Sequence, residues 1–298
     1  MPRPWAVILA GGDGTRLHSV TTALTGEPTP KQFCRLLGST TLLDQTLHRL
    51  SGIVEDRRTA LLVSSAHRRY YEPLRANRPA SLFVEQPANN GTAVGMTFAL
   101  GRVRQVDRDA VVGFFPSDHH YTDVGMFRTA VAAAYRIAAR NRDRLVLVGA
   151  TPSGPEQDYG WIEPGRPLDC PDADHAVFAV DLFWEKPDAL VASRLFRRRA
   201  LWNTFMTVGT VEAFRAALAV SRPELAAALD QIGAAPTPAS EARIVDALYS
   251  TSPRLCFSSQ VLANAPSRCV VVPLRASGWV DIGRPNRLAD LHRPALSA

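Results

Sequence analysis

Short apolar runs alternate with amphipathic stretches along the first half of the chain. The runs that predict buried strands, bounded by polar or turn-forming residues, cover residues 5–9, 60–64, 82–84, 111–115 and 145–149. Apolar residues recur at helical spacing over residues 41–50, 67–74, 93–106 and 127–139. The polar stretch between the first run and about residue 29 predicts a mobile loop. This alternation predicts an α/β fold, with a mostly parallel sheet and helices on both faces.

The pattern changes after residue 149, where a stretch rich in Pro, Gly and Asp begins. Residues 177–184 and 269–274 predict strands, and helical spacing covers residues 188–199, 212–219, 224–232 and 241–248. Neither a charged or low-complexity linker nor an internal repeat separates the two halves. We therefore expect residues 1–298 to form a single domain, in which a first half (1–150) is completed by a smaller subdomain (151–298) laid against the same site.

Composition places the chain among soluble globular proteins. Of its 298 residues, 46% are hydrophobic and 21% charged, which is enough to bury a sizeable core. No apolar run approaches the ~20 residues that span a bilayer, and no signal-peptide pattern precedes the first strand. Cys34, Cys170, Cys256 and Cys269 lie far apart without C-x-x-C spacing, as reduced thiols do. We expect a cytoplasmic protein with no membrane partner.

The charge of the chain suits an anionic ligand. The formal net charge is +6 and the pI is near 9.5, but the basic residues are spread out, and the one dense run, 197–199, follows a helical pattern typical of a solvated face. We therefore expect no nucleic-acid partner.

Only two residues of the chain are lysines, Lys31 and Lys186, and each lies beside a proline. An ammonium is a compact point charge, so both lysines are predicted to bind phosphate; chance retention in loops is the alternative.

A glycine-rich turn, Gly11-Gly12-Asp13-Gly14-Thr15-Arg16, follows the first predicted strand. Glycine leaves backbone amides open to a ligand, and such turns bind anions, most often phosphate. Leu17 occupies the third glycine position of the dinucleotide-binding fingerprint, and no Walker A lysine follows; an ordinary tight turn is the remaining alternative. This turn, residues 85–92 and Asp118 all follow predicted strands. Ligands bind beyond the carboxyl ends of such strands, so these segments predict one site.

Two carboxylates are candidates for Mg²⁺, which prefers few carboxylates together with phosphate oxygens and water. Asp118 follows a strand and faces the glycine turn, and Asp281 lies in a turn after a strand, between a Trp and a Gly. His119 and His120 raise a zinc alternative, but adjacent residues of an extended chain point to opposite faces. No Ser-His-Asp or Cys-His arrangement stands out, so we expect no covalent enzyme intermediate.

An ordered set of short blocks across nearly the whole chain resembles the sugar-1-phosphate nucleotidylyltransferases. The blocks are Leu9-Ala10-Gly11-Gly12-Asp13-Gly14-Thr15-Arg16-Leu17, Pro30-Lys31-Gln32-Phe33, Pro116-Ser117-Asp118-His119-His120, Tyr159-Gly160-Trp161-Ile162, Phe183-Trp184-Glu185-Lys186-Pro187, Trp202-Asn203 and Trp279-Val280-Asp281. Within the family they are most similar to the mannose-1-phosphate guanylyltransferases. The resemblance implies a Rossmann-like α/β fold and a direct, Mg²⁺-assisted reaction in which an NTP and a sugar 1-phosphate give an NDP-sugar and pyrophosphate. GTP and mannose 1-phosphate are the implied pair.

The resemblance also implies a role for each matching residue. The residues implied in nucleotide binding are Leu9, Gly11, Gly12, Gly14, Thr15, Arg16, Asn89, Asn90, Gly91 and Thr92. Those implied in binding the sugar phosphate are Tyr159, Gly160, Glu185, Lys186 and Asn203. Arg16 would hold the leaving phosphates, Lys31 would stabilise charge at the phosphoryl groups, and Lys186 would bind the sugar's phosphate. Asp118 and Asp281 would hold Mg²⁺. The implied catalytic set is Arg16, Lys31, Asp118 and Lys186.

Two departures from the family pattern bear on the substrates. The family's base-binding turn commonly reads Arg-Asn-Thr-Ala, whereas residues 90–93 carry Gly91 at the usual asparagine, and its Trp-Asn-Ser-Gly appears here as Trp202-Asn203-Thr204-Phe205. The alternatives for the sugar are another hexose phosphate or a cyclitol phosphate, and those for the nucleotide are dTTP or UTP in place of GTP. A non-catalytic nucleotide-sugar sensor is the alternative to an enzyme. The chain stops before the β-helix or cupin-like domain of long family members, so we expect the catalytic unit alone, with a homodimer as a candidate state.

Overall fold

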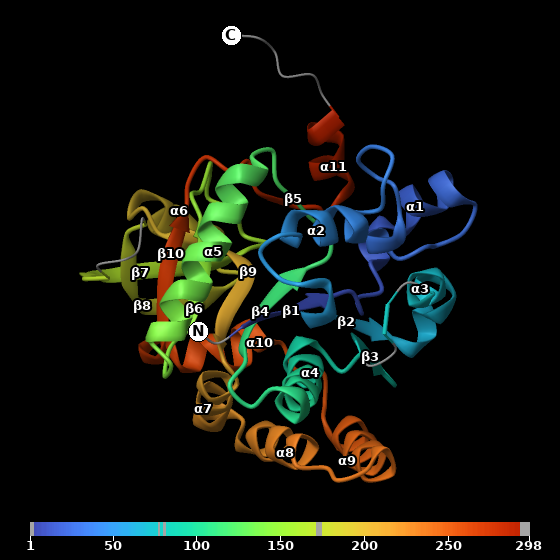
Figure 1. Cartoon of the computed structure of the whole chain (residues 1–298). Coiled ribbons are helices and arrows are strands. Elements are labelled where there is room, and N and C mark those ends of the chain that lie inside the picture. The colour runs from blue at the N-terminus through green and yellow to red at the C-terminus, as the bar shows by residue number, and fades with distance from the viewer. Residues whose placement is uncertain (1–2, 77, 80–81, 171–174, 293–298) are drawn as a thin grey trace.

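A nine-stranded mixed sheet forms the centre of the computed structural model, which describes residues 3–76, 78–79, 82–170 and 175–292 (Figure 1). The strands of this sheet and of a separate two-stranded sheet are β1 (Pro4–Leu9), β2 (Thr59–Ser64), β3 (Phe83–Gln86), β4 (Val111–Pro116), β5 (His119–His120), β6 (Leu145–Ala150), β7 (Gly160–Leu168), β8 (Val177–Glu185), β9 (Leu201–Thr210), β10 (Cys269–Leu274) and β11 (Val280–Asp281). The order in the large sheet is β3-β2-β1-β4-β9-β6-β10-β8-β7, and β5 pairs with β11.

The large sheet is mixed, with four of its eight neighbouring strand pairs parallel, and the predicted α/β fold class is confirmed. Strand β1 pairs in parallel with β2 and β4, β2 with β3, and β6 with β10. Strand β9 runs antiparallel between β4 and β6, and β8 and β7 add an antiparallel edge. Strands β7 to β10, which follow residue 150, are therefore built into the same sheet as β1 to β4 and β6.

Helices cover both faces of the sheet, as expected. They are α1 (His18–Thr25), α2 (Leu42–Leu50), α3 (Arg68–Arg75), α4 (Thr92–Val106), α5 (Val124–Arg140), α6 (Ala189–Arg197), α7 (Val211–Ser221), α8 (Pro223–Gly233), α9 (Pro238–Thr251), α10 (Phe257–Gln260) and α11 (Pro285–His292). Successive side chains of a strand point to opposite faces: Trp5 and Val7 pack with α4 and α7–α9, whereas Ala6 and Ile8 pack with α2 and α5 (Figure 1). None of the described helices has both the length and the apolar character that a membrane crossing requires.

Four segments differ from the predictions made from sequence. The stretch predicted as a loop up to residue 29 contains α1, whose only fully buried residue is Thr21, so it lacks apolar periodicity. Strand β9 was not predicted because it buries polar residues; Thr204 is fully buried and its hydroxyl donates to the carbonyl of Val148 at 2.5 Å. Asp281 lies in β11 rather than in a turn. Strand β7 also lies in the stretch whose Pro and Gly content obscured it.

The predicted site segments leave the sheet along one edge. Leu9 and Pro116, the last residues of β1 and β4, are register partners, as are Ser64 and Gln86 at the ends of β2 and β3. The glycine turn, the turn before α4 and the turn before β5 therefore meet at the carboxyl ends of the parallel strands, as predicted.

Candidate functional site

Two adjoining cavities lie at this edge of the sheet. The main cavity, of about 550 Å³, is lined by the sequence-predicted residues Leu9, Gly11, Gly12, Arg16, Lys31, Asn89, Gly91, Thr92, Asp118 and Asp281. The side cavity, of about 300 Å³, shares several of these and adds Gly14 and Thr15. Residues predicted from five separate segments and from both halves of the chain are thus brought to one site.

The glycine turn is held open toward the cavities by Gln32. Its side-chain amide donates to the carbonyls of Ala10 at 2.9 Å and Gly12 at 2.8 Å. Gly14 has a φ of 67°, and a Cβ there would lie 3.1 Å from the amide nitrogen of Lys31. Among the described residues, none of the amides of positions 11–14 donates to a backbone carbonyl. These amides are therefore available to an anion.

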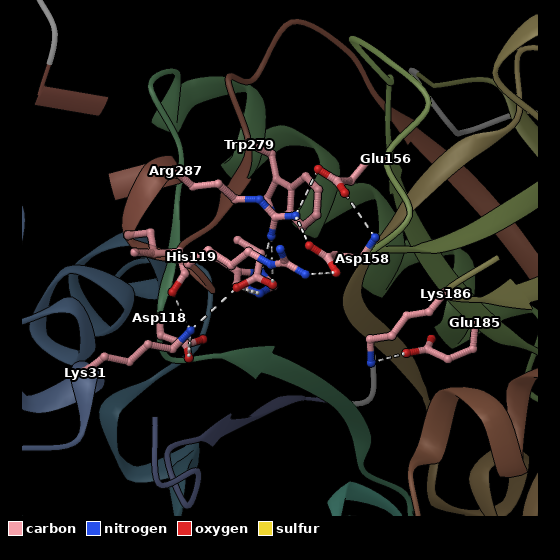
Figure 2. A network of polar contacts seen from close by, with 12 residues as sticks. Lys31, Asp118, His119, Glu156, Asp158, Glu185, Lys186, Trp279 and Arg287 are labelled. Carbon is pink, nitrogen blue, oxygen red and sulfur yellow. Dashed lines mark hydrogen bonds and ion pairs between the residues drawn. The ribbon is translucent and has the colours of Figure 1, made fainter. Parts of the chain in front are cut away.

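Lys31 is the centre of the polar network beside the turn (Figure 2). Its Nζ lies 2.9 Å from Oδ2 of Asp118 and 3.6 Å from Oδ1 of Asp281, and it donates to the carbonyl of Ile282 at 2.6 Å. The two carboxylates meet because β5 and β11 pair antiparallel, with Asp281 opposite His119. The pairing of β5 with β11, two residues long in each strand, thus joins segments about 160 positions apart in the chain.

The charges of this network support one another. Burial by itself would lower the pKa of Lys31, but the attraction of Asp118 and Asp281 outweighs it and raises that pKa above the ordinary value. Burial would likewise raise the pKa of Asp281, yet the nearby positive charges, of which Lys31 is the largest contributor, hold it below the ordinary value. Both groups are therefore charged at neutral pH.

His119 is buried beside this pair and stays neutral. Burial lowers its pKa, although Asp281 and Asp118 act in the opposite direction. Its Nε2 lies 3.8 Å from Oδ1 of Asp281, and the indole of Trp279 donates to its Nδ1. His119 is buried while His120 is partly exposed, as expected for adjacent residues of a strand.

Asp118 and Asp281 fit a divalent cation of the magnesium type. Both carboxylates lie within 3.6 Å of the ammonium of Lys31, and both residues line the main cavity. Two carboxylates completed by phosphate oxygens and water are a common Mg²⁺ environment. Within the described residues no cluster of three or more His, Cys, Asp and Glu side chains is arranged to hold a metal ion.

The turn before α4 divides into residues that line the cavities and one that does not. Asn89 lines both cavities and donates to Oδ2 of Asp13 at 3.0 Å, which ties this turn to the glycine turn. The side chain of Asn90 instead donates to the carbonyls of Tyr249 and Ser252, and Asn90 does not line either cavity. Of the two asparagines that the sequence offers for the base, the cavity geometry favours Asn89.

Gly91 is closed in by a segment from the second half of the chain. Its φ is 87°, and a Cβ there would overlap the carbonyl oxygen of Leu255 and lie 2.8 Å from its nitrogen. Leu255 donates to the carbonyl of Asn90 at 2.8 Å and accepts from the amide of Ala93 at 3.0 Å. The departure from the family's asparagine therefore has a structural cause: the backbone of Leu255 occupies the space that a side chain would take.

The predicted sugar-phosphate residues form a second group. Gly160 is opposite Glu185 in the β7–β8 pair, and a Cβ at Gly160 would lie 3.0 Å from Oε2 of Glu185 and 3.1 Å from Cβ of Asn203. Lys186 forms an ion pair with Glu185 at 3.0 Å, apart from the Lys31 network (Figure 2). None of these residues, nor Tyr159, lines the main or the side cavity. The structure thus gathers the group but leaves it outside the two cavities.

Two residues near this group have left-handed backbones without being glycine. Lys186 has a φ of 50° and Phe205 a φ of 63°, which costs free energy and is common at functional sites. The amide of Phe205 donates to Oδ1 of Asn203 at 3.0 Å, where β9 is irregular against β6. Phe205 lines the main cavity, so it lies between the sugar-phosphate group and the glycine turn.

An aromatic cluster connects the two groups. The ring of Tyr159 contacts Trp202, with centroids 5.1 Å apart, and Trp279, with centroids 4.9 Å apart. Trp279 in turn bonds His119 beside Asp281. Arg287 of α11 lies over Tyr159 at 4.2 Å and forms ion pairs with Glu156 and Asp158 (Figure 2).

The sequence reasoning missed several cavity residues. Gln32, Gln86 and Phe205 lie in segments that the sequence analysis named, but they were given no binding role, and Cys256 was interpreted only as a reduced thiol. Arg254 was not considered. Nothing in the spacing around Arg254 indicates that it meets a turn about 240 residues earlier in the chain.

Comparison with known proteins agrees with this geometry. Residues 5–297 match the sequence profile of the nucleotidyl transferase family. The chain is 29% identical over 281 residues to a mannose-1-phosphate guanylyltransferase of Escherichia coli, covering 93% of this chain and 57% of that protein. It is 30% identical over 304 residues to another of Salmonella typhimurium, covering 97% and 60%. The chain therefore spans less than two thirds of the length of these relatives.

A solved structure has the same fold. A protein of Thermus thermophilus, described as a mannose-1-phosphate geranyltransferase, superimposes with a TM-score of 0.80 at 23% identity, over 94% of this chain and 76% of that one. At this identity the likeness concerns the fold.

Proposed function

The chain belongs to the nucleotidyl transferase family, and we propose that it transfers a nucleotidyl group from an NTP to a sugar 1-phosphate, releasing pyrophosphate. GTP and mannose 1-phosphate are the proposed pair, since the similar bacterial proteins carry the name mannose-1-phosphate guanylyltransferase. We further propose that residues 1–298 act as one catalytic domain.

The observation that carries the proposal is the meeting of a phosphate-binding turn, one lysine and two carboxylates at a single cavity. Lys31 lies within 3.6 Å of both Asp118 and Asp281, and the three residues line the same cavity as Gly11 and Gly12. Open amides, a fixed ammonium and a cation site are the groups that phosphoryl transfer requires, because its catalysis is mostly positioning and charge neutralisation.

In the proposed reaction an oxygen of the sugar phosphate attacks the α-phosphorus of the NTP in line. The bond from that phosphorus to the bridging oxygen breaks, and pyrophosphate leaves with the electron pair. The amides of the glycine turn and Arg16 bind the phosphates, and Lys31 donates to the oxygens on which negative charge develops. Asp118 and Asp281 would hold Mg²⁺, which would neutralise phosphate charge and orient the NTP.

The second group binds and orients the nucleophile. Glu185 accepts hydrogen bonds from sugar hydroxyls, and Gly160 allows the sugar to approach the backbone of β7. Lys186 binds the sugar's phosphate; its side chain is more than half exposed, with the carboxylate of Glu185 beside the ammonium, so a phosphate can reach it. The strained backbone of Lys186 supports a functional role for this residue.

A grid of NTPs and sugar 1-phosphates tests the proposal, with pyrophosphate release measured in Mg²⁺ and in EDTA. We expect a Mg²⁺-dependent maximum at GTP with mannose 1-phosphate. A maximum at another pair would keep the reaction and reassign the substrates, which would direct attention to Gly91 and Phe205. If no pair releases pyrophosphate, the proposed enzymatic function is wrong, and a nucleotide-sugar sensor becomes the favoured alternative. Lys186→Ala should raise the KM for the sugar phosphate and leave the KM for the NTP unchanged.

A further inference from the structure

Arg254 brings a free cation to the cavities from the second half of the chain. It lines both the main and the side cavity and is exposed. In the described part of the chain its guanidinium has no hydrogen bond or ion pair, whereas Lys31, which also lines both cavities, is paired with Asp118 at 2.9 Å. The resemblance to the family assigns no role to this position.

The backbone that carries Arg254 is fixed against the turn before α4. Its neighbour Leu255 is buried and makes two backbone hydrogen bonds to that turn, with Asn90 and Ala93. The amide of Phe257, which is fully buried, donates to the hydroxyl of Thr92 at 2.9 Å. Only the side chain of Arg254 therefore has to be ordered when a ligand binds, which limits the entropy that binding costs.

The side cavity shows which ligand atoms Arg254 can reach. Its walls include residues 12–17 of the glycine turn, Lys31 and Arg254, so Arg254 borders the same space as the amides that are open to phosphate. Of the acidic groups on these walls, Asp13 is within 3.2 Å of His67 and 3.0 Å of Asn89, and Asp118 is paired with Lys31. Neither carboxylate is paired with Arg254, so a phosphate in this cavity meets a guanidinium without an acidic partner.

We propose that Arg254 binds the β- and γ-phosphates of the NTP, which leave as pyrophosphate. The proposal rests on the proposed nucleotidyl transfer. As the bond between the α-phosphorus and the bridging oxygen breaks, that oxygen keeps the electron pair, and Arg254 donates hydrogen bonds to the departing pyrophosphate without giving up a proton. A guanidinium matches phosphate oxygens in a bidentate geometry, so lysine is an incomplete replacement. Arg254 thus extends the phosphate site of the first half with a residue of the second.

The test compares Arg254→Ala, Arg254→Lys and a matched control, Arg243→Ala. Arg243 is an exposed arginine of α9 that lines neither cavity, so its removal changes the net charge equally. For Arg254→Ala we expect the KM for the NTP, and the KM for pyrophosphate in the reverse reaction, to rise about 10- to 100-fold, the worth of a hydrogen bond to a charged group. The KM for the sugar phosphate should stay unchanged, and Arg254→Lys should restore part of the loss.

Equal kinetics for Arg254→Ala and Arg243→Ala would overturn the proposal, as would a rise confined to the KM for the sugar phosphate. Circular dichroism of each variant identifies any that fails to fold, in which case Arg254→Lys carries the comparison. If the wild-type chain releases no pyrophosphate, the proposed function fails separately. Calorimetric binding of inorganic pyrophosphate with Mg²⁺ then decides: weaker binding in Arg254→Ala than in Arg243→Ala supports the phosphate site, and equal binding refutes it.

Discussion

The indole Nε1 of Trp279 lies 3.1 Å from Nδ1 of His119 and, because an indole nitrogen only donates, makes that ring nitrogen the acceptor. The proton of the neutral imidazole is therefore on Nε2, which faces Oδ1 of Asp281 at 3.8 Å. A tryptophan two positions before Asp281 thus points the N–H of His119 toward one of the carboxylates proposed to hold Mg²⁺.

Trp279→Phe should weaken Mg²⁺ binding without removing either of the proposed metal ligands, because it removes the hydrogen bond that fixes the ring of His119. Substitutions that affect the groups behind a metal ligand typically cost about 10- to 100-fold in metal affinity, so we expect the Mg²⁺ concentration for half-maximal rate to rise by that order. Trp184→Phe is the control, because Trp184 also donates to a carboxylate, Glu163 at 2.7 Å, but lines neither cavity. An unchanged Mg²⁺ requirement in Trp279→Phe would contradict the positioning role.

Lys31→Ala should abolish most activity and make stability depend on metal. We expect the rate to fall about 100- to 1000-fold, as when a donor that stabilises transition-state charge is removed. Without the ammonium, Asp118 and Asp281 repel each other, so Mg²⁺ should raise the Tm of Lys31→Ala more than that of the wild type. Lys31→Arg should not rescue the rate, because a guanidinium is too large for a site within 3.6 Å of three oxygens. Near-normal turnover in either variant would refute the role.

Gly91→Ala should be far more destabilising than Gly38→Ala. The two glycines have almost the same φ, 87° and 86°, but a Cβ at Gly38 meets nothing within 4 Å, whereas one at Gly91 overlaps the backbone of Leu255. Gly38→Ala therefore measures the cost of the left-handed backbone alone, about 1–2 kcal/mol. We expect Gly91→Ala to cost at least about 1 kcal/mol more, the lower range for overpacking. If chemical denaturation shows that both variants lose the same free energy of unfolding, the backbone of Leu255 moves aside without cost and the prediction is wrong.

Much of the fold could be predicted from the sequence, because its strands are apolar runs. The strands that precede Gly11 and Asp118, β1 and β4, were predicted nearly to the residue, since local hydrophobic patterning determined them. Strand β9 could not be found this way: Asn203, Thr204 and Thr207 are buried, and partners distant in the chain satisfy Asn203 and Thr204. The burial of such residues depends on tertiary contacts that no local pattern reveals.

Residues of the candidate site could be predicted where a short local motif identifies them. Lys31, Asp118 and the glycine turn follow this rule. The positions of Arg254 and Leu255 could not be predicted, because they depend on how the segment after α9 packs onto the turn before α4. The sequence could show that Gly91 departs from the family, but only the contact with Leu255 explains the departure.

His67 should titrate below its ordinary pKa of 6.5, because burial outweighs the attraction of Asp13. Since the folded pKa lies below the unfolded one, the stabilisation from the neutral ring is complete above pH 6.5 and is lost as the pH falls toward the folded value. Asp13→Asn should lower the pKa of His67 further, as followed by NMR, whereas Asp246→Asn on α9 should not change it. A pKa at or above 6.5 would contradict this prediction.

Cys256 should report nucleotide binding through its rate of alkylation. It is partly exposed and lines the main cavity, whereas burial raises the pKa of Cys34 to about 11 and that of Cys269 to about 12, which keeps those thiols protonated and slow to react. We expect the NTP with Mg²⁺ to slow the modification of Cys256, measured by mass spectrometry for each site. Cys170, also partly exposed but at a different cavity, is the internal control. Equal slowing at both cysteines would indicate a global effect instead.

The insertion of β9 between β4 and β6 sets the order in which a newly synthesised chain can mature. A ribosome-bound chain that ends before residue 201 can pair β1 to β4 but leaves the facing edges of β4 and β6 without partners. Such unpaired edges are prone to aggregation. Asp281 and its strand emerge later still, so the proposed cation site can close only after residue 281 has been translated. Truncated chains should therefore be substrates for chaperones and proteases rather than partly active enzymes.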